Sequence, residues 1–374
     1  MSPRHADPLD NCSRTLTTRH WGYSSLEVEI APIQAEPFAC VWLPTSQPRS
    51  ERLVLEANPD HWNLERGPRL ERVVFRNDLS PAGALELVCT TEGEVDVVTE
   101  VAPADARRVS DSEHAKLVRV DAMRVLVGVV NRDAEGAPLH DVRVRRALNL
   151  AVDRDRLIRE AFGGYAYPLA GLTPHYAAGV PEGQQPYPHD ADRARELLAE
   201  ARWPAGRALR LAVPADLEGV ARLLADGYTR SLGVEVDLTV IPPERLLAAQ
   251  HALVEKVLPL PFDVLVHAWF DLSADAPPAV LHREFFHSTG AFRAGPPIAE
   301  LEQLLARFAV TTDPVLSGQL AIDIDRFVYD QALGVFLCAP QALYAVNRHV
   351  AFDGYAATFE LAETEVTPQH WSRR

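Results

Sequence analysis

From residue 190 to residue 270, helix-type and strand-type segments alternate, and this alternation constrains the fold more than any other feature of the chain. Amphipathic helical patterns at 190–203, 217–233 and 243–254 alternate with the strand-type segments ALRLAV, VEVDLTVI and FDVLVHAW. Helices of this length between strands are typical of βαβ units, whose strands lie in a mostly parallel sheet. The sequence therefore predicts an α/β fold.

The stretch DVRVRRALNLAVDRDRLI, residues 141–158, has the pattern of two consecutive helices. Val144, Leu148 and Val152 share one helical face, so we expect them to be buried. Asp141 and Asp153 stand where each helix would begin, and aspartate is a preferred N-cap residue. The stretch is therefore predicted to be a helix pair packed into a core.

Three arginines lie between the apolar residues of this stretch. Arg143, Arg145 and Arg146 fall largely off the apolar face, so we expect them to be solvated or paired with acids. A nucleic-acid contact is the alternative, but the chain carries a net charge of −15. Because such a charge repels phosphate backbones and anionic lipid, nucleic-acid and membrane-surface functions are disfavoured.

The ends and cysteines of the chain bear on its location. No apolar run approaches the ~20 residues that span a bilayer. The opening residues MSPRHADPLDNC lack the apolar core of a signal peptide, so a cytoplasmic location is expected for the sequence as written. A truncated or mis-assigned N-terminus would make the protein extracytoplasmic. The four cysteines form no C-x-x-C pair, which gives no support for a zinc cluster or a dithiol redox site.

Motifs of the common catalytic classes are not found in the sequence. It has no G-x-S-x-G, Walker-A or G-x-G-x-x-G pattern. His282 and His287 lie five residues apart, and not four, as two metal ligands on one helical face would. We therefore predict no enzymatic activity, no cofactor and no bound metal.

Several blocks together resemble the family 5 extracellular solute-binding proteins, the oligopeptide- and dipeptide-binding group of ABC importers. The most specific block is APLHDVRVRRALNLAVDRDRLIREAFGGYAYPLAG, which resembles the signature helix pair of the family. ERLVLEANPDHW, YPHDADRARELLAEARWPAG and FDVLVHAWFDLSADAPP resemble further blocks in the family's order. The resemblance runs from about residue 36 to the C-terminus.

The resemblance implies a two-lobe, type II periplasmic-binding-protein-like fold of the α/β class. The first lobe is expected to be abbreviated, because the family's Gly-rich entry segment is replaced by residues 34–38 and its long inserted domain has no counterpart. Lobe I is expected to combine residues 1–127 with a returning segment, 336–374, and lobe II to span 128–335.

The resemblance also implies a ligand site around the segment HAWFDLSAD. In peptide-binding relatives, this region holds an extended peptide through its backbone, and an aspartate pairs with the peptide's amino terminus. Trp269, Phe270 and Asp271 are the matching residues here, although Asp271 stands one residue earlier than in the family. The alternatives are core packing for Trp269 and a solvated loop acid for Asp271.

Three further residues are candidate ligand contacts. Arg283 and Arg293 could bind a ligand carboxylate, because the planar guanidinium matches its geometry. A surface loop held by Arg–Glu pairs is the alternative. Asn131 follows a strand expected to cross between the lobes, and it completes the predicted ligand-binding set.

The predicted function is binding of a peptide-like solute, with an ABC permease as the partner that the resemblance implies. The alternative is a cytoplasmic protein that uses the same fold to sense a ligand or to hold a partner.

Overall fold

The computed structural model describes residues 42–44, 51–61, 63, 65, 68–177, 180–255, 261–270, 279–354 and 361–374, with only the backbone described at 42–44, 270, 279 and 280. The described chain forms two compact units. Unit 1 takes in the described residues up to Val120 together with Ala342–Arg374, and unit 2 is Asp121–Gln341. The boundaries expected at 127/128 and 335/336 fall inside two strands of unit 2, β6 (Arg124–Val130) and β11 (Gly334–Pro340).

Unit 1 is built from short antiparallel sheets, and its C-terminal segment supplies a strand. One sheet has the order β1-β2-β3 and a second has the order β4-β12-β5, in which β12 returns from the end of the chain. The strands are β1 (Trp42–Pro44), β2 (Arg52–Ala57), β3 (Arg72–Arg76), β4 (Val97–Val98), β5 (Ala115–Val120), β12 (Ala342–Asn347), β13 (Val350–Ala351) and β14 (Glu365–Val366). The helices are α1 (Pro81–Thr90), η2 (Pro103–Asp105), α2 (Ala106–Ser110) and η4 (Trp371–Arg373).

Unit 2 is organised around one six-stranded sheet with the order β7-β11-β6-β10-β8-β9. The strands are β6 (Arg124–Val130), β7 (Ala166–Pro168), β8 (Leu209–Pro214), β9 (Val236–Ile241), β10 (Val264–Phe270) and β11. β8, β9 and β10 are parallel, as the alternating pattern predicts, whereas β6, β11 and β7 pair antiparallel. The expectation of a mostly parallel sheet was wrong for this half, because these strands lie outside the βαβ units at 190–270.

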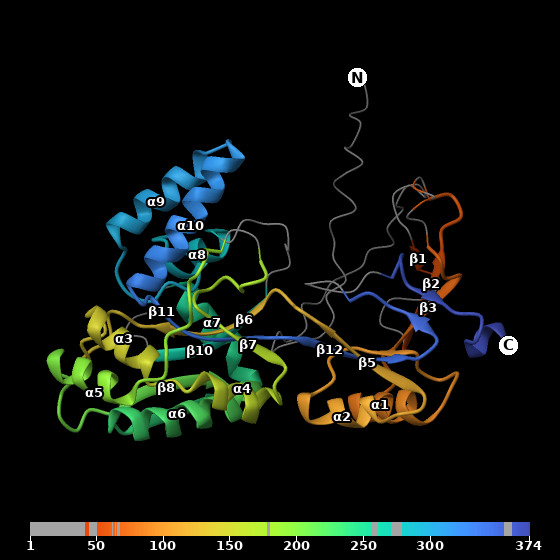
Figure 1. Cartoon of the computed structure of the whole chain (residues 1–374), viewed down its shortest axis with the longest axis horizontal. Helices are drawn as coiled ribbons and strands as arrows, with labels where there is room; N and C mark the ends of the chain where they lie inside the picture. The colour runs from red at the N-terminus through yellow and green to blue at the C-terminus, as the bar shows by residue number, and fades with distance from the viewer. Residues whose placement is uncertain are drawn as a thin grey trace. The chain divides into compact units, whose positions relative to one another are not determined.

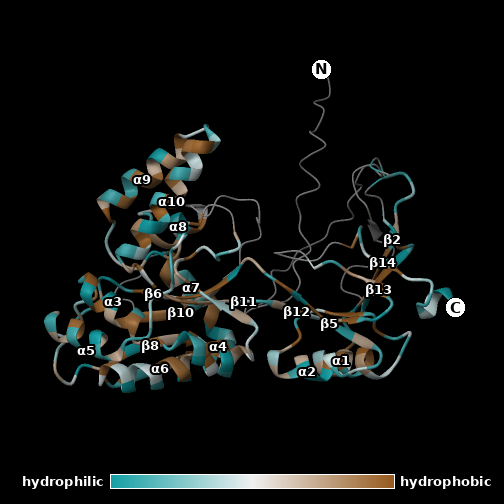
Figure 2. Ribbon diagram, viewed as in Figure 1, coloured by the Kyte–Doolittle hydropathy of each residue, from teal (hydrophilic) through white to brown (hydrophobic). Residues whose placement is uncertain are grey.

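Helices cover both faces of this sheet (Figure 1). One face packs against α3 (Val142–Leu150), α4 (Arg154–Phe162), α5 (Ala191–Glu200) and α6 (Glu218–Leu232), and the other against α8 (Ala279–Phe286), α9 (Ala299–Val310) and α10 (Pro314–Asp330). The short η3 (Ala215–Leu217) precedes α6, and α7 (Pro243–Val254) joins β9 to β10. Figure 2 shows strands that are largely hydrophobic and helices on which hydrophilic and hydrophobic residues alternate. The α/β class is confirmed.

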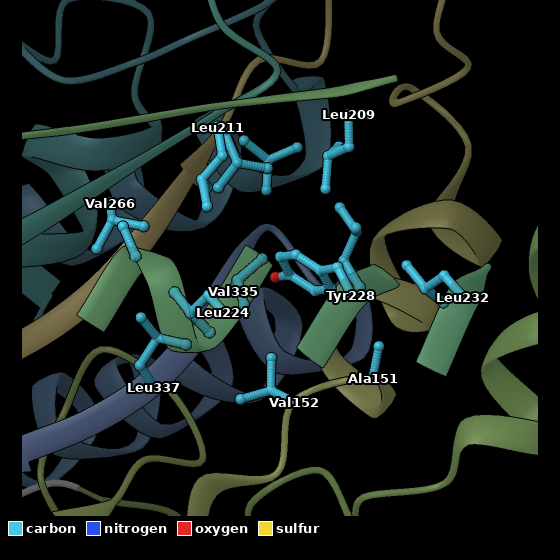
Figure 3. Close-up of a cluster of buried hydrophobic side chains, with 14 of the residues drawn as sticks. Ala151, Val152, Leu209, Leu211, Leu224, Tyr228, Leu232, Val266, Val335 and Leu337 are labelled. Atoms are coloured by element: carbon cyan, nitrogen blue, oxygen red, sulfur yellow. The ribbon is translucent and has the colours of Figure 1, made fainter. Parts of the chain in front are cut away.

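The predicted helix pair lies in the first of these helix layers. Val144, Leu148 and Val152 are buried, and Figure 3 shows Val152 among side chains from α6, β8, β10 and β11. Asp141 accepts a hydrogen bond from Arg143 N and Asp153 from Arg156 N, so both predicted caps are present. The burial and the caps are confirmed.

The prediction for the arginines was wrong at Arg145. Arg143 is exposed and pairs with Asp141, and Arg146 is exposed and donates to the carbonyl of Asp330. Arg145 is only 4% exposed, and its guanidinium donates to the carbonyls of Leu139, His140, Gln331 and Ala332. Its position off the apolar face points it at the C-terminal end of α10, where carbonyls lack helical partners.

Asn149 and Arg154, two further residues of the signature stretch, bind the backbone of β11 through their side chains. β7 pairs with β11 only at residues 338–340. Before that point, Asn149 accepts from Phe336 N and donates to Gly334 O, and Arg154 donates to Phe336 O. The two side chains therefore continue the hydrogen bonding of β11 where β7 does not reach. Their role in the fold is structural.

Candidate functional site

In α/β sheets, ligands bind beyond the carboxyl ends of the parallel strands. In unit 2 this edge is formed by the ends of β8, β9 and β10, and Trp269 lies at the end of β10. β10 pairs with β6 along its whole length but with β8 only at Val264 and Leu265. Among the described residues, the last part of β10 therefore extends beyond its pairing with β8 and has no strand partner on that side.

The ring of Trp269 is held in one orientation by two phenylalanines. It meets Phe285 edge-on at a centroid distance of 5.5 Å and Phe292 edge-on at 4.9 Å. Phe285 and Phe292 stack on each other at 5.3 Å. Edge-to-face contacts of this kind stabilise aromatic pairs beyond their buried area. Trp269 remains half-buried, so it both packs on the core and presents part of its surface.

Phe285 and Phe292 were not recognised as part of this site from the sequence. Both lie in the segment REFFHSTGAF, in which only charged residues and histidines are candidate site residues from the sequence. Its three phenylalanines in ten residues were the available signal. They predict an aromatic cluster, but not its contact with Trp269.

His267 lies two residues before Trp269 on the same face of β10. Its ring lies 5.1 Å from that of Phe292, and its Nε2 atom is buried without a hydrogen-bond partner among the described residues. Burial lowers the pKa of His267 to about 4, because the charged imidazolium loses its hydration. The imidazole is therefore neutral at pH 7 and contributes no positive charge to the site.

The remaining predicted contacts at this end of the strand are only partly described. The backbone of Phe270 pairs with Arg124 at the start of β6. The side chain of Phe270, and the whole of Asp271, lie outside the described residues.

Arg293 and Asn131 already have partners within the fold. Arg293 is half-buried and donates to the carbonyls of Ser288 and Gly295. Asn131 is buried, donates to Phe262 O and accepts from Asp133 N. It follows β6 at the end opposite Arg124, and a strand of seven residues separates them by roughly 20 Å. The structure does not bring Asn131 to Trp269.

The charged segment after β10 is organised by two separate histidine pairs. His282 is buried, and its Nε2 lies 2.8 Å from Asp325 Oδ1, which also accepts from Thr173. His287 pairs with Glu302 at 3.1 Å. The two imidazoles thus face different acids, and the described residues contain no group of three or more potential metal ligands. Arg283 is exposed on α8.

A cavity of about 340 Å³ lies on the other side of the sheet. Its lining comes from α4, α5 and α6 and the segment before α4, and includes Leu157, Leu224 and Ser231. Trp269 is not part of it, so the cavity does not belong to the candidate site.

Among the described helices, none is long and apolar enough to cross a membrane.

Two curated relatives match parts of the chain. The dipeptide-binding protein of Escherichia coli is 25% identical over 185 residues, which is 50% of this chain and 33% of that protein. The glutathione-binding protein of Salmonella choleraesuis is 35% identical over 95 residues, 25% of this chain and 18% of that protein. The chain thus matches a third or less of the length of these two relatives.

Solved structures share the fold. The ABC transporter substrate-binding protein CtaP of Listeria monocytogenes has a TM-score of 0.73 at 19% identity, covering 87% of this chain and 66% of its own. The periplasmic binding protein DppA of Helicobacter pylori, in complex with the peptide STSA, has a TM-score of 0.66 at 17% identity, covering 87% of this chain and 62% of its own. These neighbours confirm the type II periplasmic-binding-protein fold.

The family profile described as bacterial extracellular solute-binding proteins, family 5, middle region, matches residues 32–291, well over half of the chain. The match includes the signature helix pair, β10 and the segment that supplies Phe285. The chain therefore belongs to family 5 of the bacterial extracellular solute-binding proteins.

Proposed function

We propose that the protein binds a peptide-like solute on unit 2, at the carboxyl ends of β8, β9 and β10. The observation that carries this proposal is the geometry of Trp269, whose ring is fixed by Phe285 and Phe292 at the end of a strand that extends beyond its neighbour. An extended peptide can add to such a strand through its backbone while an aromatic ring contacts its side chains. Membership of a solute-binding family supports the same function.

Within this proposal the candidate residues have different roles. Trp269 and Phe270 contact the solute, and Asp271 pairs with its ammonium group. Arg283, exposed on α8, can bind a solute carboxylate. Arg293 and Asn131 are given no solute contact in this proposal, because their polar groups bind carbonyls and an amide of the fold, and Asn131 follows the opposite end of β6.

We further propose that the protein acts without catalysis, outside the cytoplasmic membrane, and delivers its solute to an ABC permease. The family is one of extracellular solute-binding proteins, and the solved neighbours include an ABC transporter substrate-binding protein. The net charge of −15 is consistent with a partner other than nucleic acid.

Peptides with and without a free amino terminus test the proposal. We expect short free peptides to quench tryptophan fluorescence, and N-acetylated versions to bind more weakly by about 1.5–3 kcal/mol, because the charge-assisted pair with Asp271 is lost. Asp271→Asn should remove this difference, and Asp275→Asn in the same segment is the matched control.

Two results would contradict the proposal at different points. Equal affinity for free and acetylated peptides would show that Asp271 does not bind the amine. Failure of every peptide to bind would show that the solute is not a peptide.

A further inference from the structure

Three aromatic rings in unit 2 form a cluster that the candidate site does not include. Tyr167 of β7 lies 4.8 Å from His175 and 5.8 Å from Tyr176, and His175 lies 5.1 Å from Tyr176, all between ring centroids. All three contacts are edge-to-face, with interplanar angles of 64–77°. His175 is exposed, and the two tyrosines are half-buried. The cluster is therefore ordered by ring contacts but still reaches solvent.

Hydrogen bonds fix the cluster to the start and the end of unit 2. The Tyr176 hydroxyl donates to Ala122 O at 2.5 Å. The side-chain amide of Gln341 donates to Asp121 Oδ1 at 2.7 Å and to the Tyr167 hydroxyl at 3.3 Å. Both tyrosines and the Asp121 carboxylate are thus held in place before any ligand arrives, which lowers the entropic cost of binding.

Asp121 and Arg124 place charges of opposite sign near Tyr176. Burial raises the pKa of Tyr176, and the carboxylate of Asp121 raises it further. The guanidinium of Arg124 acts in the opposite direction, but more weakly than Asp121 does. The faces of aromatic rings are themselves negative, so rings beside a carboxylate attract organic cations.

We propose that Tyr167, His175, Tyr176 and Asp121 form a subsite for an organic cation, the guanidinium or ammonium group of a basic solute. The rings supply cation–π contact and Asp121 supplies the opposite charge. This subsite deepens the proposed function, on which it rests for the identity of the natural solute. If both hold, solutes with a basic side chain are preferred over their neutral isosteres by about 10-fold.

The test uses argininamide, a cation that has neither a peptide chain nor a carboxylate. Both probes are used with the α-amino group acetylated, so that the guanidinium is the only charge of argininamide and citrullinamide is its neutral isostere. The readout is the NMR shift of the His175 ring carbons during titration of the full chain. We expect saturable shifts with argininamide, at least about 10-fold weaker binding in Asp121→Asn, and no saturation with citrullinamide.

A variant at an exposed residue separates a loss of binding from a loss of folding. His175→Ala changes an exposed side chain and should weaken argininamide binding without lowering the melting temperature; the readout for this variant is the Tyr176 ring. His251→Ala, exposed on α7, is the matched control and should bind as the wild type does. Any one of three results would overturn the subsite. The first is that argininamide causes no change in the His175 shifts, and the second is that citrullinamide binds as tightly as argininamide. The third is that Asp121→Asn and His175→Ala both bind argininamide with wild-type affinity. None of these outcomes depends on whether peptides bind at Trp269.

Discussion

Asp263→Ala is expected to lower the free energy of unfolding of unit 2 by about 3–5 kcal/mol, the largest loss from any single substitution considered for this chain. The carboxylate of Asp263 is fully buried at the start of β10. Both of its oxygens accept from Arg207 at 2.8 Å, and it also accepts from the guanidinium and the backbone N–H of Arg210. Its removal leaves two partly buried guanidinium groups without their counter-charge.

Urea unfolding, followed by circular dichroism, measures this effect. Asp237→Ala is the matched control, because Asp237 is exposed on β9 of the same sheet, and its loss should change stability by less than about 0.5 kcal/mol. If Asp263→Ala lowered the free energy of unfolding by less than about 1 kcal/mol, water would be shown to solvate the two guanidinium groups in place of the carboxylate.

Arg145→Met is expected to cost about 2–4 kcal/mol, since it leaves buried carbonyls unsatisfied while methionine fills most of the volume. The carbonyls belong to Leu139, His140, Gln331 and Ala332, and desolvation at this position lowers the pKa of Arg145 to about 10. The guanidinium nevertheless stays charged at pH 7, and the carbonyl dipoles that surround it replace water.

Thermal and urea unfolding of Arg145→Met and Arg143→Met, side by side, give the comparison. Arg143 is exposed two residues away on the same helix, so its replacement should be near neutral. Equal, small effects of both substitutions would restore the sequence-based expectation that Arg145 is a solvated side chain.

The local parts of the fold could be predicted from the sequence because their causes are local. The two caps expected from the sequence, Asp141 and Asp153, each accept from an N–H within the first turn of their helix. The apolar face of α3 depends only on helical periodicity. Such features need no knowledge of distant chain segments.

The burial and the hydrogen bonds of Arg145 could not be predicted in this way. Its partners Gln331 and Ala332 follow almost 190 residues later, and periodicity identifies a side chain that leaves the apolar face without showing what it meets there. The antiparallel half of the sheet was missed for a related reason. β6 and β11 pair with each other although they lie near opposite ends of unit 2 in the sequence, so no local pattern shows their contact.

For the candidate site, the resemblance located Trp269 on its strand but did not supply its surroundings. Phe285 reaches it from α8 and Phe292 from the segment after α8, and these contacts arise from tertiary packing. Asn131 was included because it follows a strand, but the direction of β6 carries it to the opposite end of the sheet. Strand direction is set by pairing with β10, which the sequence does not show.

Isothermal titration calorimetry with an unmodified tripeptide tests the central claim most directly. The account predicts saturable binding of one peptide per chain with a negative heat-capacity change, since apolar surface is buried against Trp269. Trp269→Ala should abolish the binding, and Trp371→Ala, which removes a partly exposed tryptophan of unit 1, should leave it unchanged. Saturable binding that is the same in wild type and in a folded Trp269→Ala would contradict the account, because the solute would then bind away from the end of β10.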